Sequence, residues 1–198
     1  LEEYFIQTDR VSFNGSKALE PPKKLNEYQV KALDIIKQNF KNKKVTLLKG
    51  VTSSGKTEVY VKLIAECLSE GKQALYLVPE IAITTQLISR LLEYFGSTIS
   101  VFHSKYNMHE KVEVLKNVLN NRPKAQLIIG ARSALFLPFA DLGLIIIDEE
   151  HETSFKQYDP APRYHARVTA IVMGSLFNSN VLLGSATTSV ESYKNTQT

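Results

Sequence analysis

One stretch decides the fold of this chain: Gly50-Val51-Thr52-Ser53-Ser54-Gly55-Lys56-Thr57. It fits the pattern G-x-x-x-x-G-K-[S/T], in which glycines allow backbone N–H groups to turn toward phosphate oxygens. The apolar run 45–48 precedes it and a helical pattern follows it, so we expect a strand, a loop and a helix in that order. The positive N-terminal end of that helix would face the same anion. The structural alternative is a glycine turn that only caps a helix.

This loop supplies candidate ligands for ATP and Mg²⁺. Its backbone N–H groups would surround the phosphates of a nucleotide. Lys56 would reach the β- and γ-phosphates, and the Thr57 hydroxyl would bind Mg²⁺. The candidates for nucleotide binding in the loop are Gly50, Thr52, Ser53, Ser54, Gly55, Lys56 and Thr57.

A second motif starts in the apolar run 144–147 and continues into three carboxylates. Consecutive apolar residues indicate a strand that is buried on both faces, as in a parallel sheet. Asp148, Glu149 and Glu150 follow at its C-terminal end, where open α/β sheets bind ligands. Asp148 is therefore a candidate for holding Mg²⁺, and Glu149 for activating an attacking water. A solvated acidic loop is an equal alternative for this segment alone, but the phosphate-loop pattern upstream favours the metal–phosphate site.

The composition is typical of a globular protein, with 198 residues, 43% hydrophobic and 22% charged. No apolar run is long enough to span a membrane, and no secretory signal pattern opens the chain. The single cysteine, Cys67, excludes an internal disulfide and a cysteine-based zinc site, and we expect it to be buried. These features favour a cytoplasmic protein. The net charge of +4 fits a nucleic-acid partner without specifying one.

Strand and helix patterns alternate along the chain. We expect strands at 45–49, 74–78, 99–102, 126–129, 144–148 and 180–184, and helices at 26–40, 55–70, 81–95, 108–121 and about 164–177. This alternation predicts an α/β domain of three layers, with helices on both faces of a mostly parallel central sheet. The motif residues all follow strands, so one crevice at the C-terminal edge of the sheet can collect them.

The ends of the chain differ from this regular part. Residues 1–24 have weak periodicity, a Gly-Ser pair and two adjacent prolines, so we expect a linker or the edge of a preceding domain. Residues 25–198 would form the ATP-binding domain. Because the chain begins with Leu1 and stops soon after a motif-like segment, we expect it to be a piece of a larger protein.

Further polar segments follow the expected strands, at 77–86, 102–104, 130–136 and 184–189. In order, the phosphate loop, V-P-E, G-A-R-S, D-E-E-H and G-S-A-T resemble the first motor lobe of superfamily 2 helicases. The segment 148–151 is similar to motif II of that superfamily, and 184–187 is similar to its motif III.

The resemblance is closer to one family, the PriA primosomal replication-restart helicases (primosomal protein N′). It covers about residues 25–195. The segments that carry it are G-V-T at 50–52, E-V-Y at 58–60, L-V-P-E-I at 77–81, G-A-R-S-A-L-F at 130–136, D-E-E-H at 148–151, F-K-Q-Y at 155–158 and P-R-Y-H-A-R at 162–167.

This resemblance implies the first RecA-like lobe of an ATP-dependent 3′-to-5′ DNA helicase that acts in replication restart and primosome assembly. The partners it implies are single-stranded and forked DNA, other primosome proteins and single-stranded DNA-binding protein, with no membrane. DNA-binding domains would precede residue 1, and a second lobe with zinc-binding cysteines and an arginine finger would follow residue 198. Without that arginine, we expect this chain alone to hydrolyse ATP weakly or not at all.

The resemblance also assigns roles to single residues. Gln29 matches a glutamine that reads adenine, and its amide can pair with the adenine edge. A capping box with Asn26 is the competing interpretation of Gln29. His151 and Thr187 would couple the nucleotide state to DNA, and the alternative for His151 is a structural histidine.

Residues 153–167 interleave aromatic and basic side chains. Aromatic faces stack on bases while cations neutralise phosphates, so this composition suits single-stranded DNA. The segment resembles the family's aromatic-rich loop, which links DNA binding to hydrolysis. The alternatives are that its aromatic rings pack onto the domain and that Arg132 pairs with the acidic cluster. The DNA-binding candidates are Phe155, Lys156, Tyr158, Arg163 and Tyr164, together with Arg132 and Ser133.

Two other functions remain open at this stage. The first is a non-catalytic module that binds nucleotide or DNA, against which the intact Lys56, Asp148 and Glu149 argue. The second is another superfamily 2 translocase, such as a RecG-like helicase, against which the segment 155–167 argues.

Overall fold

The fold is built on a parallel sheet. The computed structural model describes residues 19–42, 44–51, 54–102 and 106–187, and within them the sheet has six strands in the order β1-β6-β5-β2-β4-β3. All neighbouring strands pair in parallel. The strands are β1 (Val45–Lys49), β2 (Gln73–Leu77), β3 (Ile99–Phe102), β4 (Leu127–Gly130), β5 (Leu142–Ile147) and β6 (Asn180–Ser185).

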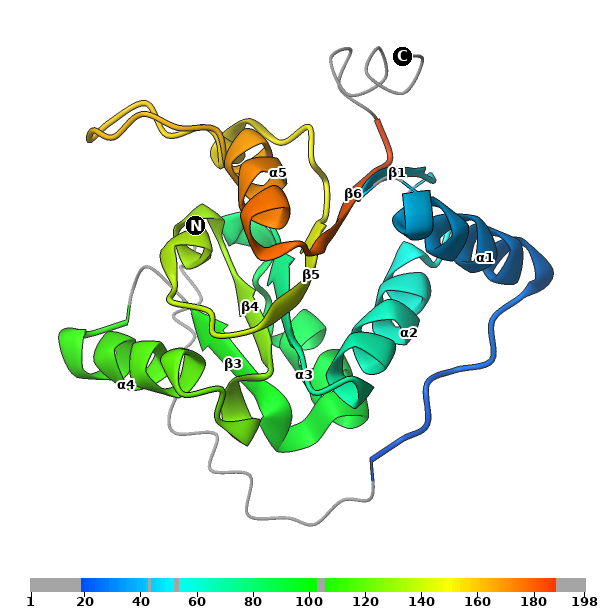
Figure 1. Cartoon of the computed structure of the whole chain (residues 1–198), viewed down its shortest axis with the longest axis horizontal. Coiled ribbons are helices and arrows are strands. Elements are labelled where there is room, and N and C mark those ends of the chain that lie inside the picture. The colour runs from blue at the N-terminus through cyan, green and yellow to red at the C-terminus, as the bar shows by residue number, and fades with distance from the viewer. Residues whose placement is uncertain (1–18, 43, 52–53, 103–105, 188–198) are drawn as a thin grey trace, which may run out of the picture.

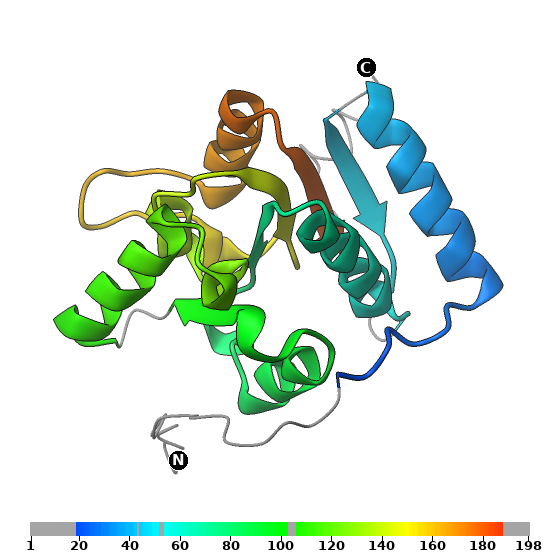
Figure 2. The same ribbon diagram turned by 60° about the horizontal axis from the view of Figure 1, so that its bottom comes forward.

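Helices cover both faces of this sheet, as Figures 1 and 2 show. One face packs against α1 (Glu27–Asn42), α2 (Lys56–Ser69) and α3 (Thr85–Phe95), whose apolar residues share one core with that side of the strands. The other face packs against α4 (Met108–Leu119) and α5 (Ala166–Phe177), which share a second core. The three-layer α/β fold is therefore confirmed.

The expected elements are present, and most ends shift by only one or two residues. The helix predicted from residue 81 is the exception, because α3 begins at Thr85. A single 3-10 turn, Glu80–Ala82, occupies the gap, and the Thr84 side chain caps α3 by accepting a hydrogen bond from the Leu87 backbone at 3.2 Å. The cap residue Thr84, which follows this turn, sets the start of α3. The apolar periodicity of the sequence alone places that start too early in the chain.

The strand order brings distant motifs together. β6 lies between β1 and β5, with Lys49 in register with Ser185 and Ile147 in register with Leu183. The loop after β1, the carboxylates after β5 and the turn after β6 therefore meet at the C-terminal edge of three adjacent strands, as the sequence predicts. Within the described residues, no helix has both the length and the apolar character needed to cross a membrane.

Candidate functional site

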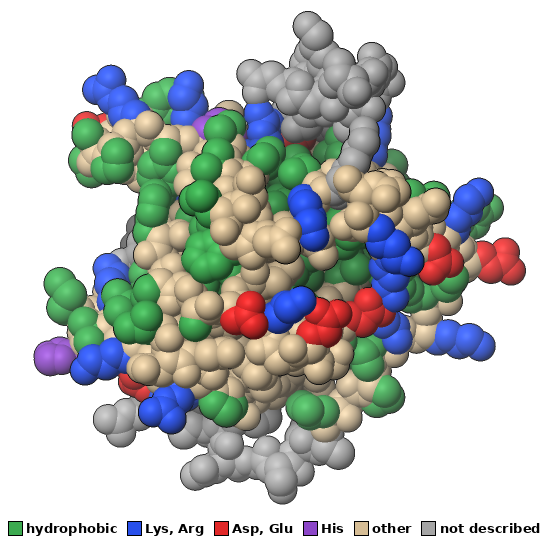
Figure 3. All heavy atoms as spheres, in the orientation of Figure 1, with side chains coloured by type: hydrophobic (Ala, Val, Ile, Leu, Met, Phe, Trp, Pro, Cys, Tyr) green, Lys and Arg blue, Asp and Glu red, His purple; other side chains and the backbone are tan. Residues whose placement is uncertain are grey.

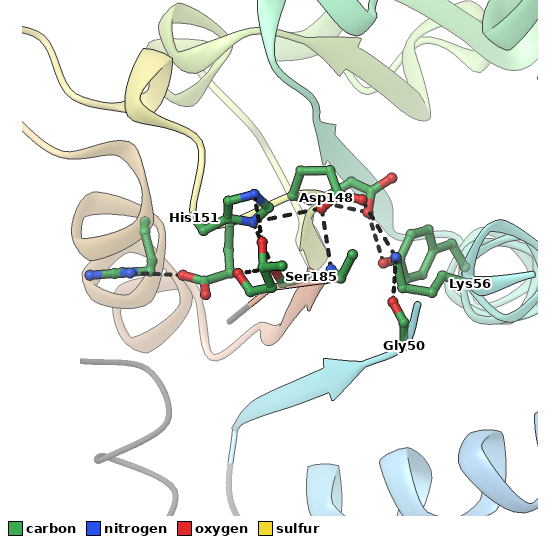
Figure 4. Close-up of polar contacts among 11 residues, drawn as sticks. Gly50, Lys56, Asp148, His151 and Ser185 are labelled. Carbon is green, nitrogen blue, oxygen red and sulfur yellow. Dashed lines mark hydrogen bonds and ion pairs between the residues drawn. The ribbon is translucent and has the colours of Figure 1, made fainter. Parts of the chain in front are cut away.

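The phosphate-loop segment has the backbone geometry that its glycines permit. Gly55 has a left-handed conformation with φ of 81°, and α2 begins at the next residue, Lys56. The Lys56 ammonium donates to the Gly50 carbonyl at 2.8 Å, and the Gly50 N–H donates to the Ser185 carbonyl at 3.0 Å. Figure 4 shows the Lys56 side chain extending from α2 toward the Gly50 carbonyl. Thr52 and Ser53 lie outside the described residues.

Gln29 contacts this loop from α1. Its backbone N–H donates to the Asn26 side chain and its side-chain oxygen accepts from the Asn26 N–H, both at 2.9 Å, so the predicted capping box is present. The other end of its amide donates to the carbonyls of Ser54 at 3.4 Å and Gly55 at 3.3 Å. A Cβ on Gly55 would lie 2.1 Å from this amide nitrogen, so the Gln29 side chain would have to move if residue 55 carried a side chain. Adenine recognition by Gln29 stays a prediction.

Asp148 is the most enclosed carboxylate that faces the loop. Its Oδ1 accepts from the Tyr60 hydroxyl at 3.0 Å and from the Glu149 N–H at 3.1 Å, and its Oδ2 accepts from the Tyr76 hydroxyl at 3.1 Å. Burial raises the pKa of Asp148, while the two tyrosine hydrogen bonds act in the opposite direction. Burial and the adjacent carboxylate also raise the pKa of both tyrosines, so each hydroxyl keeps its proton and donates it.

Glu149 lies on the open side of the site, at a turn where its own φ is 51°. One carboxylate oxygen is 3.4 Å from the Lys56 ammonium, and the other accepts from the Ala186 N–H at 3.3 Å. Lys56 is only 9% exposed whereas Glu149 is 32% exposed, so the carboxylate retains access to solvent. In this arrangement Glu149 is suited to accept a proton from water. Lys56 is suited to exchange its contact with the Gly50 carbonyl for one with a phosphate.

His151 joins the acidic motif to the turn after β6. Its Nδ1 lies 2.7 Å from the Ser185 hydroxyl oxygen and its Nε2 lies 3.0 Å from the Thr187 hydroxyl oxygen. Because Ser185 donates its own hydrogen to the Thr187 carbonyl at 2.8 Å, it accepts from Nδ1–H, and Nε2 then accepts from Thr187. The Glu149 carboxylate is 3.7 Å from Nδ1. Figure 4 shows His151 and Ser185 on one side of Asp148 and Lys56 on the other.

Several residues that contact the predicted site residues are not among those that the sequence predicts. Ser185 belongs to the G-S-A-T segment, so the motif itself carried its signal. Tyr60 follows Lys56 by four residues and therefore lies on the same face of α2. Tyr76 has no comparable signal, because its apolar neighbours in β2 indicate only a buried strand. Glu150 is fully buried and pairs with Arg167 of α5 at 2.7 Å, which ties the acidic motif to the end of the aromatic segment.

Two predictions for the aromatic segment change with the structure. Phe155 is 1% exposed and belongs to the core that also contains residues of α5, so it packs onto the domain and its ring is not presented to a base. Arg132 donates to the carbonyls of Ser154 at 2.7 Å and Lys156 at 3.4 Å, so its pairing with the acidic cluster is wrong. The guanidinium has only N–H donors, and these two backbone carbonyls accept from it. Arg132 thereby organises the loop.

The rest of the segment forms a hairpin that projects from the domain (Figure 1). An antiparallel bridge joins Lys156 to His165, and the Gln157 N–H donates to the Tyr164 carbonyl at 2.8 Å. Tyr158 is 62% exposed, and the Lys156 ammonium lies 4.6 Å from the centre of its ring. Figure 3 shows basic and apolar side chains together on this projection, at the upper left.

The base of the hairpin is less open than its tip. Arg163 is exposed, but Tyr164 is half-buried and its ring meets Phe136 edge to face at 4.9 Å. Ser133 is half-buried within the 3-10 turn Arg132–Phe136. Of the predicted DNA contacts, the structure therefore presents Lys156, Tyr158 and Arg163 most openly.

The site fits a nucleotide that carries a divalent metal ion. It combines a buried cation, Lys56, a helix N-terminus, and two carboxylates of which Asp148 is held in place by hydrogen bonds. Thr57 is half-buried in the first turn of α2. Among the described residues, no group of three or more histidine, cysteine or acidic side chains could hold a metal by itself.

Comparisons with known proteins agree with this geometry. The model of the family described as DEAD/DEAH box helicase matches residues 26–196. The replication restart protein PriA of Rickettsia conorii is 47% identical over 171 residues, which cover 86% of this chain and 26% of that protein. PriA of Bacillus subtilis is 44% identical over 178 residues, which cover 89% of this chain and 22% of that protein.

Solved structures show the same fold at lower identity. RecG bound to a three-way DNA junction matches with a TM-score of 0.62 and 23% identity, over 87% of this chain and 22% of that one. The UvsW helicase from bacteriophage T4 matches with a TM-score of 0.56 and 17% identity, over 85% of this chain and 55% of that one. These likenesses confirm the RecA-like fold. The chain spans about a quarter of the length of the curated relatives, at 26% and 22%.

Proposed function

Because this chain belongs to the DEAD/DEAH box helicase family, we propose that it is the ATP-binding motor lobe of a PriA-type, 3′-to-5′ replication-restart DNA helicase. Identities of 47% and 44% to two PriA proteins support this assignment over a RecG-like one. The observation that carries it is the position of Lys56, between the Gly50 carbonyl and the Glu149 carboxylate at the edge of the sheet. A carboxylate beside the phosphate-binding lysine fits a hydrolase, which needs a base, better than a module that only binds nucleotide.

Each side chain has a distinct part in hydrolysis. The N–H groups at the start of α2 bind phosphate oxygens, and Lys56 exchanges the Gly50 carbonyl for the β- and γ-phosphates. Asp148 and Thr57 would hold Mg²⁺, which would supply positive charge beside the phosphates when bound. Glu149 orients the attacking water and accepts its proton. Gln29 supplies an amide for the adenine edge, after it leaves the carbonyls of the loop.

The link to DNA begins at His151. Its hydrogen bonds to Ser185 and Thr187 connect the base-bearing turn to the turn after β6, so a shift of Glu149 toward the nucleotide moves both turns. The hairpin 156–165 is the DNA-binding element, with Tyr158 stacking on a base and Lys156 and Arg163 neutralising phosphates.

In this proposal, the other domains of the helicase belong to a longer protein that contains this lobe. In this proposal residues 25–198 are the lobe and residues 1–24 lead into it, while a second lobe supplies the arginine finger and a zinc site. Related phosphate-loop enzymes gain roughly 10³–10⁵ in rate from such an arginine, so this chain alone hydrolyses ATP slowly. Primosome proteins and single-stranded DNA-binding protein are its proposed partners, and the cytoplasm its proposed location.

The first test is the ATPase rate of this chain and of the full-length protein, each with and without single-stranded DNA. We expect a DNA-stimulated full-length enzyme and a nearly silent isolated lobe. In the full-length enzyme, Lys56→Ala should abolish turnover without lowering the melting temperature of the lobe. An enzyme that binds DNA but never hydrolyses ATP would leave only a binding module.

A second test separates the hairpin from the catalytic site. We expect the double change Lys156→Ala and Tyr158→Ala to lower DNA-stimulated ATPase far more than basal ATPase. Tyr28→Ala is the matched control, because Tyr28 is 86% exposed on α1. Equal loss of stimulated and basal rates in the hairpin variant would mean that the hairpin supports the fold and does not bind DNA.

A further inference from the structure

Two tyrosines hold the Asp148 carboxylate from inside the core. Tyr60 comes from α2 and Tyr76 from β2, and the exposed fractions of their side chains are 0% and 1%. Their rings meet edge to face at 5.8 Å, and their hydroxyls end on the two different oxygens of Asp148. Asp148 therefore has a phenolic donor on each oxygen.

Packing alone does not require these hydroxyls. Phenylalanine fills nearly the same volume, and a buried hydroxyl costs stability unless it has a hydrogen-bond partner. Here the partner is in each case the same carboxylate, at 3.0 and 3.1 Å. Their common target indicates that both hydroxyls serve Asp148.

The donors among the described residues leave one side of Asp148 open. Within that part of the chain, its Oδ1 accepts two hydrogen bonds, from Tyr60 and from the Glu149 N–H, whereas Oδ2 accepts one, from Tyr76. A carboxylate oxygen offers about two lone-pair directions, so Oδ2 keeps one for a metal ion or for a water bound to it. The tyrosines thus fix the carboxylate plane and leave an acceptor in a defined direction.

Tyr60 also links the loop to this carboxylate. It lies one helical turn after Lys56, on the same face of α2, so the phosphate-binding helix end and the donor to Asp148 form one rigid unit. A Cβ on Gly184 of β6 would lie only 1.8 Å from the Tyr60 hydroxyl oxygen. The glycine of the G-S-A-T segment therefore makes room for this hydroxyl.

We propose that Tyr60 and Tyr76 are positioning residues that orient Asp148 toward the magnesium of a bound nucleotide. The proposal rests on the proposed function, because it assigns Mg²⁺ to Asp148. Neighbours that orient metal ligands contribute about 10- to 100-fold to metal affinity in other proteins. Tyr60 and Tyr76 would do so without adding a charge to the core.

The test measures nucleotide binding by the chain, with no need for turnover. Fluorescent methylanthraniloyl-ADP is titrated into wild type, Tyr60→Phe, Tyr76→Phe and the double variant, first in EDTA and then over a series of Mg²⁺ concentrations. Tyr94→Phe is the control, because Tyr94 is also buried, on α3, but is not a donor to Asp148. Melting temperatures verify that each variant is folded.

The expected result is selective for magnesium. Each variant should need about tenfold more Mg²⁺ for half-saturation, with the nucleotide Kd in EDTA unchanged, and the Tyr94 variant should match wild type. An unchanged Mg²⁺ requirement in the double variant would overturn the proposal. So would equal weakening in EDTA and in Mg²⁺, which indicates a structural role. A wild-type chain that binds no nucleotide would instead refute the proposed function, and this proposal with it.

Discussion

The buried ion pair between Glu150 and Arg167 offers the sharpest test of how the acidic motif is held. The carboxylate is 0% exposed, the guanidinium is 8% exposed, and their N–O distance is 2.7 Å. Arg167→Met keeps most of the aliphatic volume and removes the charge. Because Glu150 follows Glu149 directly, loss of this anchor acts both on stability and on the turn that carries the proposed base.

The magnitude follows from burial. Removal of one partner of a buried ion pair leaves the other charge in the core without its counter-ion, which costs about 3–5 kcal/mol. The free energy of unfolding of a domain of this size is about 5–15 kcal/mol, so the variant would retain only part of its stability. At about 2–4 °C per kcal/mol, the melting temperature should fall by roughly 6–20 °C.

The assay is a double-mutant cycle by urea denaturation. Arg167→Met and Glu150→Leu are measured singly and together, and the double variant should recover most of the loss because it buries no unpaired charge. Lys37→Met is the control, since Lys37 pairs with Glu66 on the surface, where the side chains are 39% and 50% exposed. We expect Lys37→Met to lower the free energy of unfolding by less than about 1 kcal/mol. A loss below about 1 kcal/mol for Arg167→Met would refute the reasoning.

Three further outcomes are expected. Gln73→Leu should destabilise the fold by about 2–4 kcal/mol in urea, because the buried amide accepts from two backbone N–H groups and donates to two carbonyls; a loss within error would mean that these groups find other partners. Asp148→Asn should raise the melting temperature at about pH 7.5, and the gain should shrink toward about pH 4.5. The sign follows from the raised pKa of Asp148, because ionisation in the core destabilises the native state until acid protonates the carboxyl; a less stable variant at the higher pH would contradict it. Burial raises the pKa of Cys67 to about 12, so native protein at about pH 8 should react with a disulfide reagent about a thousandfold more slowly than unfolded protein; similar rates would show that the thiol is accessible.

The sequence predicted those features that depend on local chemistry. The loop 50–57, the strand before Asp148 and the capping of α1 by Asn26 each rest on residues within a few positions of one another. Backbone geometry at Gly55 and the burial of an apolar run are decided over the same short range. The C-terminal edge as the site followed from strand–helix alternation, because parallel strands all end on one side.

The tertiary structure alone decided which aromatic and polar side chains turn inward and what they contact. Phe155 stands in a segment that reads as exposed and aromatic, yet it enters the core, while Arg132 turns to backbone carbonyls. Tyr60 and Tyr76 meet at Asp148 although 88 and 72 positions separate them from it. Such contacts depend on how helices and strands far apart in the chain pack together, and no local pattern specifies that packing. The sequence by itself determined the fold and the kind of site, and the three-dimensional packing decided how its carboxylates are held.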